Sequence, residues 1–278
     1  MEPSGQLISD VHRFRSDGFL VKRGLLNAAI IEQFVETAWP VFSRLARHYN
    51  LPLSSTIEGD MIALFRHNAQ AYFSAVRVVG QLVSLLDIFR DDAIARLVCG
   101  LGVQVPCFNT GAVMHIMSNE LRPQEGYLGL GVHQDFPSTQ ASLNALIVWI
   151  PFTPANADFF PIEVLPGSHL RGILPGEQRS HVFEVLPSAY RETDFVAISV
   201  EPGDVLVMSV FAAHRSGQSG KKGVRVAASM RYEDASEGTY IARCYPNAYK
   251  RTVERQIMIP GFPSERDLHD LFHRSEQS

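Results

Sequence analysis

The feature that most constrains the fold of this chain is a series of short β-rich runs that begins after residue 102. Gly, Pro, Asn and Asp residues separate the runs, and no helical pattern of about 10–15 residues clearly intervenes. That spacing argues against a parallel βαβ sheet and favours a sandwich or jelly roll. The runs cover residues 103–108, 112–117, 143–152, 162–165, 195–200, 205–210 and 224–232.

The first hundred residues have a different period. Apolar side chains recur at helical spacing over residues 30–42, where Pro40 predicts a kink or an end. Asp91 is a candidate N-cap for a helix over residues 92–99 that stops at Gly100. This part of the chain is therefore expected to form a helical layer.

Two signals outside the main runs extend this outline. Asp17-Gly18 predicts a turn that leads into a short strand at residues 19–21, and residues 264–272 form a candidate helix. The expected fold is mainly β with a helical N-terminal layer (α+β). With no repeat or linker, a single domain over 1–278 is expected, made of a helical support at 1–102, a jelly-roll core at 103–235 and a C-terminal extension at 236–278.

Composition bounds the function. The chain has 278 residues, 46% of them apolar, so it can bury a sizeable core. A formal net charge of −4 without a basic cluster argues against a nucleic-acid partner. No apolar stretch approaches the roughly 20 residues of a membrane span. Cys99, Cys107 and Cys244 form no CxxC pair and indicate small buried hydrophobes in a reduced cytoplasm, so a cytoplasmic protein is expected.

His133-Gln134-Asp135 is the first candidate for chemistry. It lies where a strand is expected to start, and alternation along a strand puts residues i and i+2 on one face. His133 and Asp135 can therefore reach one metal ion. An imidazole and a carboxylate, completed by a second imidazole, form the facial triad of non-haem Fe(II) oxygenases. A pattern this short also arises by chance, so it counts only together with further context.

His214 is the candidate for the second imidazole. It follows an apolar run and precedes a Ser/Gly turn, and the alternative is a buried structural histidine. Arg225 lies eleven residues later, inside the next β-rich run. An Arg in an apolar strand is costly unless it meets an anion. Its fork of fixed donors suits the distal carboxylate of a dicarboxylate co-substrate.

As a set, these residues resemble the phytanoyl-CoA dioxygenase family of Fe(II)/2-oxoglutarate oxygenases. Further segments match that family in order, from about Phe14 to Tyr232. The motifs are specific as a set, although none is specific singly. They are Asp17-Gly18-Phe19-Leu20-Val21, Met114-His115-Ile116-Met117, Trp149, Val164-Leu165-Pro166-Gly167-Ser168-His169 and Pro202-Gly203-Asp204.

The resemblance implies a double-stranded β-helix in which His133, Asp135 and His214 are the iron ligands. It also implies that Arg225 binds the C5 carboxylate of 2-oxoglutarate with help from Ser216, two residues after the distal histidine. Three further residues are then expected to line the pocket without binding metal: Trp149, Gln134 and His115. In this family the histidine at the position of His169 orders a loop rather than binding metal.

The implied activity is that of a dioxygenase (hydroxylase). With Fe(II), 2-oxoglutarate and O2, it would oxidise an unactivated C–H bond of a small metabolite and release succinate and CO2. Two alternatives stay open. A metal-dependent cupin-type enzyme without 2-oxoglutarate commonly uses more His ligands and needs no buried Arg. A non-catalytic jelly-roll sugar-binding module needs the turn glycines but not the triad.

The sequence says less about the substrate. The C-terminal Ser275-Glu276-Gln277-Ser278 is not the peroxisomal tripeptide, and no basic cluster offers a seat for CoA phosphates. Residues 133–140 look similar to bacterial members that act on small polar or saccharide-type metabolites. Such a metabolite is the expected partner, with the loop after Asp135 and the N-terminal helices as its lid.

Overall fold

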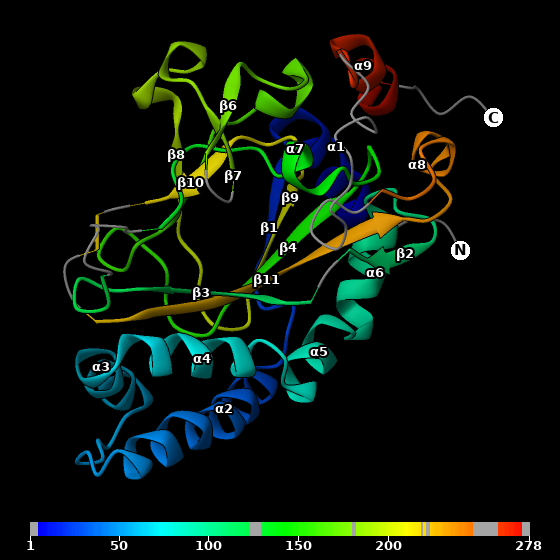
Figure 1. Cartoon of the computed structure of the whole chain (residues 1–278). Helices are drawn as coiled ribbons and strands as arrows, with labels where there is room; N and C mark the ends of the chain where they lie inside the picture. Colours follow the sequence, from blue (N-terminus) through cyan, green and yellow to red (C-terminus); the bar gives the residue numbers. More distant parts are fainter. Residues whose placement is uncertain are drawn as a thin grey trace.

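The computed structural model describes residues 5–109, 111–122, 129–179, 182–217, 219–220, 223–246 and 261–273. Its core consists of antiparallel sheets, and helices cover one side of the larger sheet (Figure 1). Within the described residues the strands do not close into a barrel. The expected mainly β fold with a helical N-terminal layer is confirmed.

The major sheet has six strands in the order β1-β9-β4-β11-β2, and β3 also pairs with β11. Strand β11 is its longest, and every residue of β11 is buried because both faces of the strand are covered. The strands are β1 (Phe19–Lys22), β2 (Pro106–Phe108), β3 (Val113–Met117), β4 (Leu146–Pro151), β9 (Val205–Ser209) and β11 (Arg225–Asp234).

The minor sheet has the order β10-β5-β8, and a separate hairpin joins β6 to β7. Its register pairs His214 with Val164 and Ser216 with Ile162. The strands are short, which agrees with the punctuated sequence in this part of the chain. They are β5 (Ile162–Val164), β6 (Gly176–Arg179), β7 (Val182–Val185), β8 (Val196–Ile198) and β10 (His214–Ser216).

Helices α2 to α5 form a layer beneath β3, β11 and β4 (Figure 1). Two-residue alternation turns one face of β11 toward this layer, and Val226, Ala228 and Met230 belong to the same apolar cluster as the buried residues of these helices. The opposite face of β11 carries Arg225 and Arg231. The helices are α1 (Gly5–Asp17), α2 (Ala28–His48), α3 (Ile57–His67), α4 (Ala69–Val79), α5 (Val83–Phe89), α6 (Asp92–Gly100), α7 (Phe136–Thr139), α8 (Gly238–Ala242) and α9 (Glu265–His273).

Local sequence signals place most of these elements. The Asp91 side chain accepts a hydrogen bond from the N–H of Ala93, so the predicted cap of α6 is confirmed. Pro40 lies inside the 21-residue helix α2 and does not end it. The predicted helix at 264–272 corresponds to α9. The hairpin β6–β7 and the short strand β10 were not predicted, because β6 and β10 are largely polar and β7 has only four residues.

One apolar cluster extends from Phe14 in α1 to Phe272 in α9 and includes residues of both the helical layer and the major sheet. From this shared core we propose that the chain forms a single domain. No single helix of the described residues has the length and apolarity to span a membrane. Helices α4 and α5 meet those criteria only as a pair, with a bend of 50° between them.

The cysteines differ from their expected environment. All three are free thiols, but Cys99 and Cys244 are exposed and Cys107 is only half-buried. The interpretation of these residues as small buried hydrophobes was therefore wrong. A pattern without CxxC pairs excludes neither environment, since thiols also occupy helix ends and turns such as those at Cys99 and Cys244.

Candidate metal centre

Three buried side chains, those of His133, Asp135 and His214, form the group that can hold a metal ion among the described residues. One ligand atom from each lies within 4.8 Å of the ligand atoms of the other two. The two imidazole rings are tilted against each other, with 4.2 Å between their centres. The three residues chosen from sequence thus meet at one point.

Main-chain pairing brings the two histidines together. His133 and His214 form an isolated antiparallel bridge in which each N–H donates to the carbonyl of the other, both at 3.0 Å. His214 is also the first residue of β10. This pairing at the end of the minor sheet therefore brings together His133 and His214, which are 81 positions apart in the chain.

Asp135 is positioned by a turn and not by the strand that the sequence predicted. It does not lie on a strand but occupies the N-cap position of α7, with φ −75° and ψ −32°. Its N–H donates to the carbonyl of Val210 at 3.0 Å, which anchors the turn. The chain turns after His133, and Oδ1 of Asp135 lies 3.5 Å from Nε2 of His133. The pair meets, but strand alternation is not the reason.

Both imidazoles have the tautomer that metal binding requires. Nδ1 of His133 lies 2.8 Å from the carbonyl oxygen of Gly131, and Nδ1 of His214 lies 3.0 Å from that of Ala212. Each Nδ1 donates its proton there, so the lone pair is on Nε2. Burial, and then the nearby His133, lower the pKa of His214 to about 4. His214 is therefore neutral at physiological pH.

The Asp135 carboxylate is ionised because of Arg231. Nε and Nη2 of Arg231 lie 2.9 Å and 2.8 Å from Oδ2 of Asp135, and both side chains are buried. Burial alone would raise the pKa of Asp135, but the charge of Arg231, together with the neighbouring His133 and His214, outweighs burial and holds that pKa well below its ordinary value. The sequence analysis missed Arg231. The sequence does place Arg231 six residues after Arg225. Because that spacing is even, both side chains lie on the same face of a strand.

Arg225 is a buried cation without a counter-ion among the described residues. It is 1% exposed, and its Nε has no hydrogen-bond partner there. The guanidinium carbon lies over the ring of Trp149, 5.4 Å from the ring centre. Burial lowers the pKa of Arg225 to about 10, so the side chain stays charged at neutral pH. A charge this deeply buried requires an anionic partner.

His115 lies between the two arginines on the inner face of the major sheet. Its Nε2 is 2.7 Å from Oγ of Ser229, and Ser229 also accepts a hydrogen bond from Nη1 of Arg231 at 2.8 Å. Burial, followed by the charges of Arg231 and Arg225, lowers the pKa of His115 well below its ordinary value. His115 is thus a neutral imidazole beside two fixed cations, and Trp149 shares that face.

Gln134 and Ser216 make other contacts than those expected. The amide nitrogen of Gln134 donates to the carbonyls of Gly172 and Phe211, and its oxygen accepts from the N–H of Leu174. This fully buried amide supports the main chain and offers nothing to a cofactor, which corrects the expectation. Oγ of Ser216 accepts from the N–H of Leu130 at 3.2 Å, and no hydrogen bond joins it to Arg225 among the described residues.

The turn Pro166-Gly167-Ser168-His169 holds the main chain next to His214 in place. Oγ of Ser168 accepts a hydrogen bond from the N–H of Ala213, directly before His214, at 2.8 Å. Nε2 of His169 donates to the carbonyl of Arg15 at 3.0 Å, and its ring lies edge-on to Phe272. His169 is not part of the metal-binding group. It holds the ends of α1 and α9 against the turn, in agreement with the ordering role expected for it.

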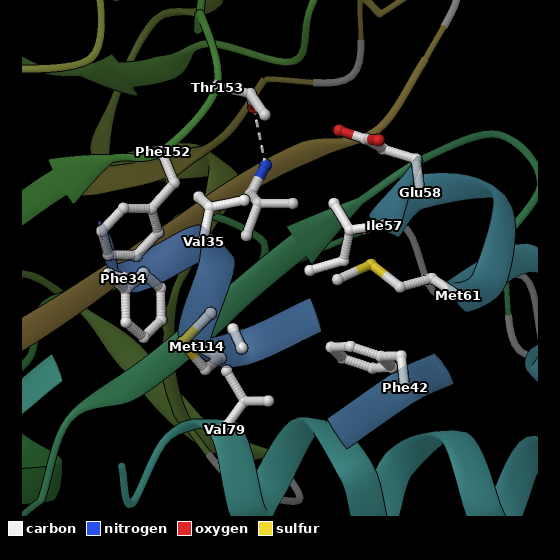
Figure 2. A pocket seen from close by; sticks show the side chains of 12 residues that line it. Phe34, Val35, Phe42, Ile57, Glu58, Met61, Val79, Met114, Phe152 and Thr153 are labelled. Atoms are coloured by element: carbon white, nitrogen blue, oxygen red, sulfur yellow. Dashed lines mark hydrogen bonds between the residues drawn. The ribbon is translucent and has the colours of Figure 1, made fainter. Parts of the chain in front are cut away.

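A separate cavity of about 60 Å³ lies on the helix-covered face of the major sheet (Figure 2). Its walls are mostly apolar and come from helices α2, α3 and α4 and from the outer faces of β3 and β11. Phe42 of α2 and Met114 of β3 are examples. Thr153 is one of its few polar residues, and its Oγ1 accepts a hydrogen bond from the N–H of Val226 at 2.8 Å. Glu58 is its one carboxylate, and no histidine lines it, so it lacks the donor set of a metal site.

Comparisons with known proteins agree with this geometry. The family model described as phytanoyl-CoA dioxygenase (PhyH) matches residues 14–227. No curated protein matches the chain.

Solved structures share the fold at low identity. The epimerase SnoN, in complex with Fe3+, alpha ketoglutarate and nogalamycin RO, is 17% identical with a TM-score of 0.60, and the match covers 94% of this chain and 93% of SnoN. The carbocyclase SnoK from nogalamycin biosynthesis is 16% identical with a TM-score of 0.54, over 86% and 91% of the two chains. EctD from S. alaskensis with bound Fe is 14% identical with a TM-score of 0.53, over 85% and 78%.

The family match covers well over half of the chain and contains all three residues of the metal-binding group as well as Arg225. The structural likeness adds the fold. The chain therefore belongs to the phytanoyl-CoA dioxygenase family, a family of non-haem Fe(II)- and 2-oxoglutarate-dependent oxygenases.

Proposed function

We propose that this protein uses Fe(II), 2-oxoglutarate and O2 to hydroxylate a C–H bond of a small molecule, with His133, Asp135 and His214 as the metal ligands. The observation that carries the proposal is Arg225. It is a buried cation without an anion among the described residues, on the sheet face that holds Arg231, the partner of Asp135.

The donor set fits the metal. Two imidazoles whose Nδ1 atoms are bonded to carbonyls and one ionised carboxylate are the ligands that non-haem Fe(II) oxygenases use, and they leave further positions open. The surroundings also fit a dianionic co-substrate. Of the two guanidiniums next to His115, that of Arg231 is paired with Asp135, and that of Arg225 is not.

Each side chain has a defined task in this proposal. Iron and 2-oxoglutarate, when bound, supply the oxidising chemistry that couples the release of succinate and CO2 to cleavage of the C–H bond. The carbonyls of Gly131 and Ala212 fix the two imidazoles. Arg225, held against Trp149, binds and orients the C5 carboxylate of 2-oxoglutarate. Burial of all these groups keeps water away from the reacting atoms.

The two competing functions leave parts of this site without a use. A cupin-type enzyme that needs no 2-oxoglutarate has no role for the unpaired Arg225, and a sugar-binding module has none for the triad. Anaerobic calorimetric titration of the Mn(II)-loaded protein with 2-oxoglutarate separates these functions. Saturable binding that requires the metal is expected, and its absence would contradict the proposal.

The substrate is a small molecule, and its finer class is part of the proposal. SnoN was solved with nogalamycin RO, and SnoK is a carbocyclase, so enzymes of this fold act on different small molecules with different outcomes. We propose hydroxylation of a polar or saccharide-type metabolite in the cytoplasm. Mass spectrometry of metabolite pools before and after incubation, searched for a gain of one oxygen atom, tests this part.

A further inference from the structure

We infer that Arg231 is a positioning residue of the metal centre, which holds Oδ2 of Asp135 so that Oδ1 is the oxygen presented to the metal. The inference rests on the proposed function, because it assigns a new role within the same site. It concerns a residue that the sequence motifs did not single out.

The two oxygens of Asp135 face different groups. Oδ2 accepts hydrogen bonds from both Nε and Nη2 of Arg231, at 2.9 Å and 2.8 Å. Oδ1 lies 3.5 Å from Nε2 of His133, the nitrogen that carries the lone pair. The side chains of Asp135 and Arg231 are 4% and 7% exposed, so solvent does not compete for either oxygen. The contact with Arg231 therefore decides which oxygen is available.

The guanidinium of Arg231 is itself fixed by the major sheet. Its Nη1 donates to Oγ of Ser229 at 2.8 Å, and Ser229 contacts His115 on β3 at 2.7 Å. Arg231 also lies in the paired centre of β11, opposite Ile147 of β4. The rigid sheet thus sets the position of Arg231, and Arg231 sets the rotation of a carboxylate that belongs to a different segment.

Asp135 needs this restraint because of its place in the chain. It is the N-cap residue of α7, and an N-cap aspartate ordinarily turns its carboxylate toward the first amides of its helix. Asp135 makes no such capping hydrogen bond. The helix has no free amide for it, because Pro137 has no N–H, the N–H of Phe136 donates to the carbonyl of Val210, and the N–H of Ser138 donates to the main-chain carbonyl of Asp135. Among the described residues, Arg231 is therefore the group that fixes the rotation of the carboxylate, and without it Oδ2 loses both of its hydrogen bonds.

The two arginines of β11 then have separable tasks. Arg225 acts on the co-substrate, and Arg231 acts on a metal ligand. Loss of an outer partner of a metal ligand typically weakens metal affinity about 10- to 100-fold. Arg231→Met, which keeps the apolar stem, is therefore expected to weaken Co(II) binding by that factor. Arg225→Met is expected to leave Co(II) affinity unchanged.

Titration with Co(II), followed by its visible spectrum, measures both affinity and coordination geometry. Arg231→Lys keeps the charge but not the two parallel donors, so it should recover part of the affinity and show an altered Co(II) spectrum. Arg66→Met is the matched control, since it breaks an exposed ion pair with Glu120 that includes no residue of the metal-binding group, and it should change neither. Far-UV circular dichroism checks the fold of each variant.

A double-mutant cycle tests whether Arg231 acts through Asp135. In an Asp135→Ala background, Arg231→Met should cause no further loss of Co(II) affinity, because the oxygen that it positions is gone. An equal loss in both backgrounds would overturn the inference, as would wild-type affinity in Arg231→Met. If Arg231→Met does not fold, the same cycle with Arg231→Lys decides. A wild-type protein that binds no Co(II) would instead contradict the proposed function.

Discussion

The guanidinium of Arg225 lies over the indole ring of Trp149, with 5.4 Å between the guanidinium carbon and the ring centre. Strand β4 supplies the ring and β11 supplies the cation, and both side chains are almost completely buried. The aromatic face offsets part of the cost of burying the charge and leaves the N–H edge of the guanidinium open to an anion. The arrangement explains how an apolar strand accommodates an arginine.

Replacement of Arg225 by Met tests this relationship. The variant keeps the apolar contacts of the stem and loses a bidentate, charge-assisted contact with the C5 carboxylate, worth roughly 2–4 kcal/mol. The expected weakening of 2-oxoglutarate affinity is about 30- to 1000-fold, measured by calorimetry on Mn(II)-loaded protein. Oxoacids without the distal carboxylate serve as the control and should bind both proteins equally. An unchanged 2-oxoglutarate affinity would make Arg225 a structural residue.

Replacement of His133 or His214 by Ala should abolish tight metal binding and leave the fold intact. Each variant removes one of the three residues that can hold the metal ion, and neither side chain belongs to the apolar core clusters. His169→Ala is the contrasting variant. It should keep metal affinity but lose thermal stability, because its ring is fully buried against Phe272 and bonded to the carbonyl of Arg15. Metal titration and melting curves separate the two outcomes.

The stability of the metal-free protein should fall in mildly acidic solution. Burial lowers the pKa of His214 from 6.5 to about 4 in the native state, so between these values the unfolded state binds more protons. Stability contributed by neutral His214 is present above pH 6.5 and is lost as the pH falls toward 4, by about 3 kcal/mol. Urea unfolding across this window measures it, and His214→Gln should show a shallower pH dependence.

Gly18→Ala should destabilise the protein more than Gly24→Ala. Both glycines have positive φ, +80° and +57°, so each substitution costs about 1–2 kcal/mol of backbone strain. At Gly18 the added Cβ would also overlap the ring of His169, whereas nothing lies within 4 Å of it at Gly24. The difference between the two melting temperatures reports the overlap. Equal losses would show that the ring of His169 does not pack on Gly18 in solution.

Much of this fold could be predicted from sequence because the signals were local. The turn residues between β-rich runs marked most strands, and the cap at Asp91 marked α6. Strand β6 gave no such signal, since Glu177, Gln178 and Arg179 are polar and exposed. Pro40 was compatible with a helix end, but tertiary packing of the long apolar face of α2 overrides a single proline.

The sequence predicted which side chains come together at the candidate site, but not the residues that hold them in place. His133, Asp135, His214 and Arg225 follow from residue type and spacing. The contact of Arg231 with Asp135 could not be read off the sequence, because it joins residues 96 positions apart through the pairing of β11. Gln134 was misjudged because its position next to the ligands does not reveal that its side chain turns toward the backbone of Gly172, Leu174 and Phe211.

The most direct test of the central claim is succinate formation from 2-oxoglutarate by the purified protein with Fe(II), ascorbate and O2. The account predicts succinate and CO2 in equal amounts, even without substrate at a slow uncoupled rate, and none when iron is omitted. Asp135→Ala and His214→Ala should be inactive, and Arg225→Met should need far more 2-oxoglutarate. Succinate formation at the wild-type rate in these variants, or none in the wild type under any iron loading, would contradict the account.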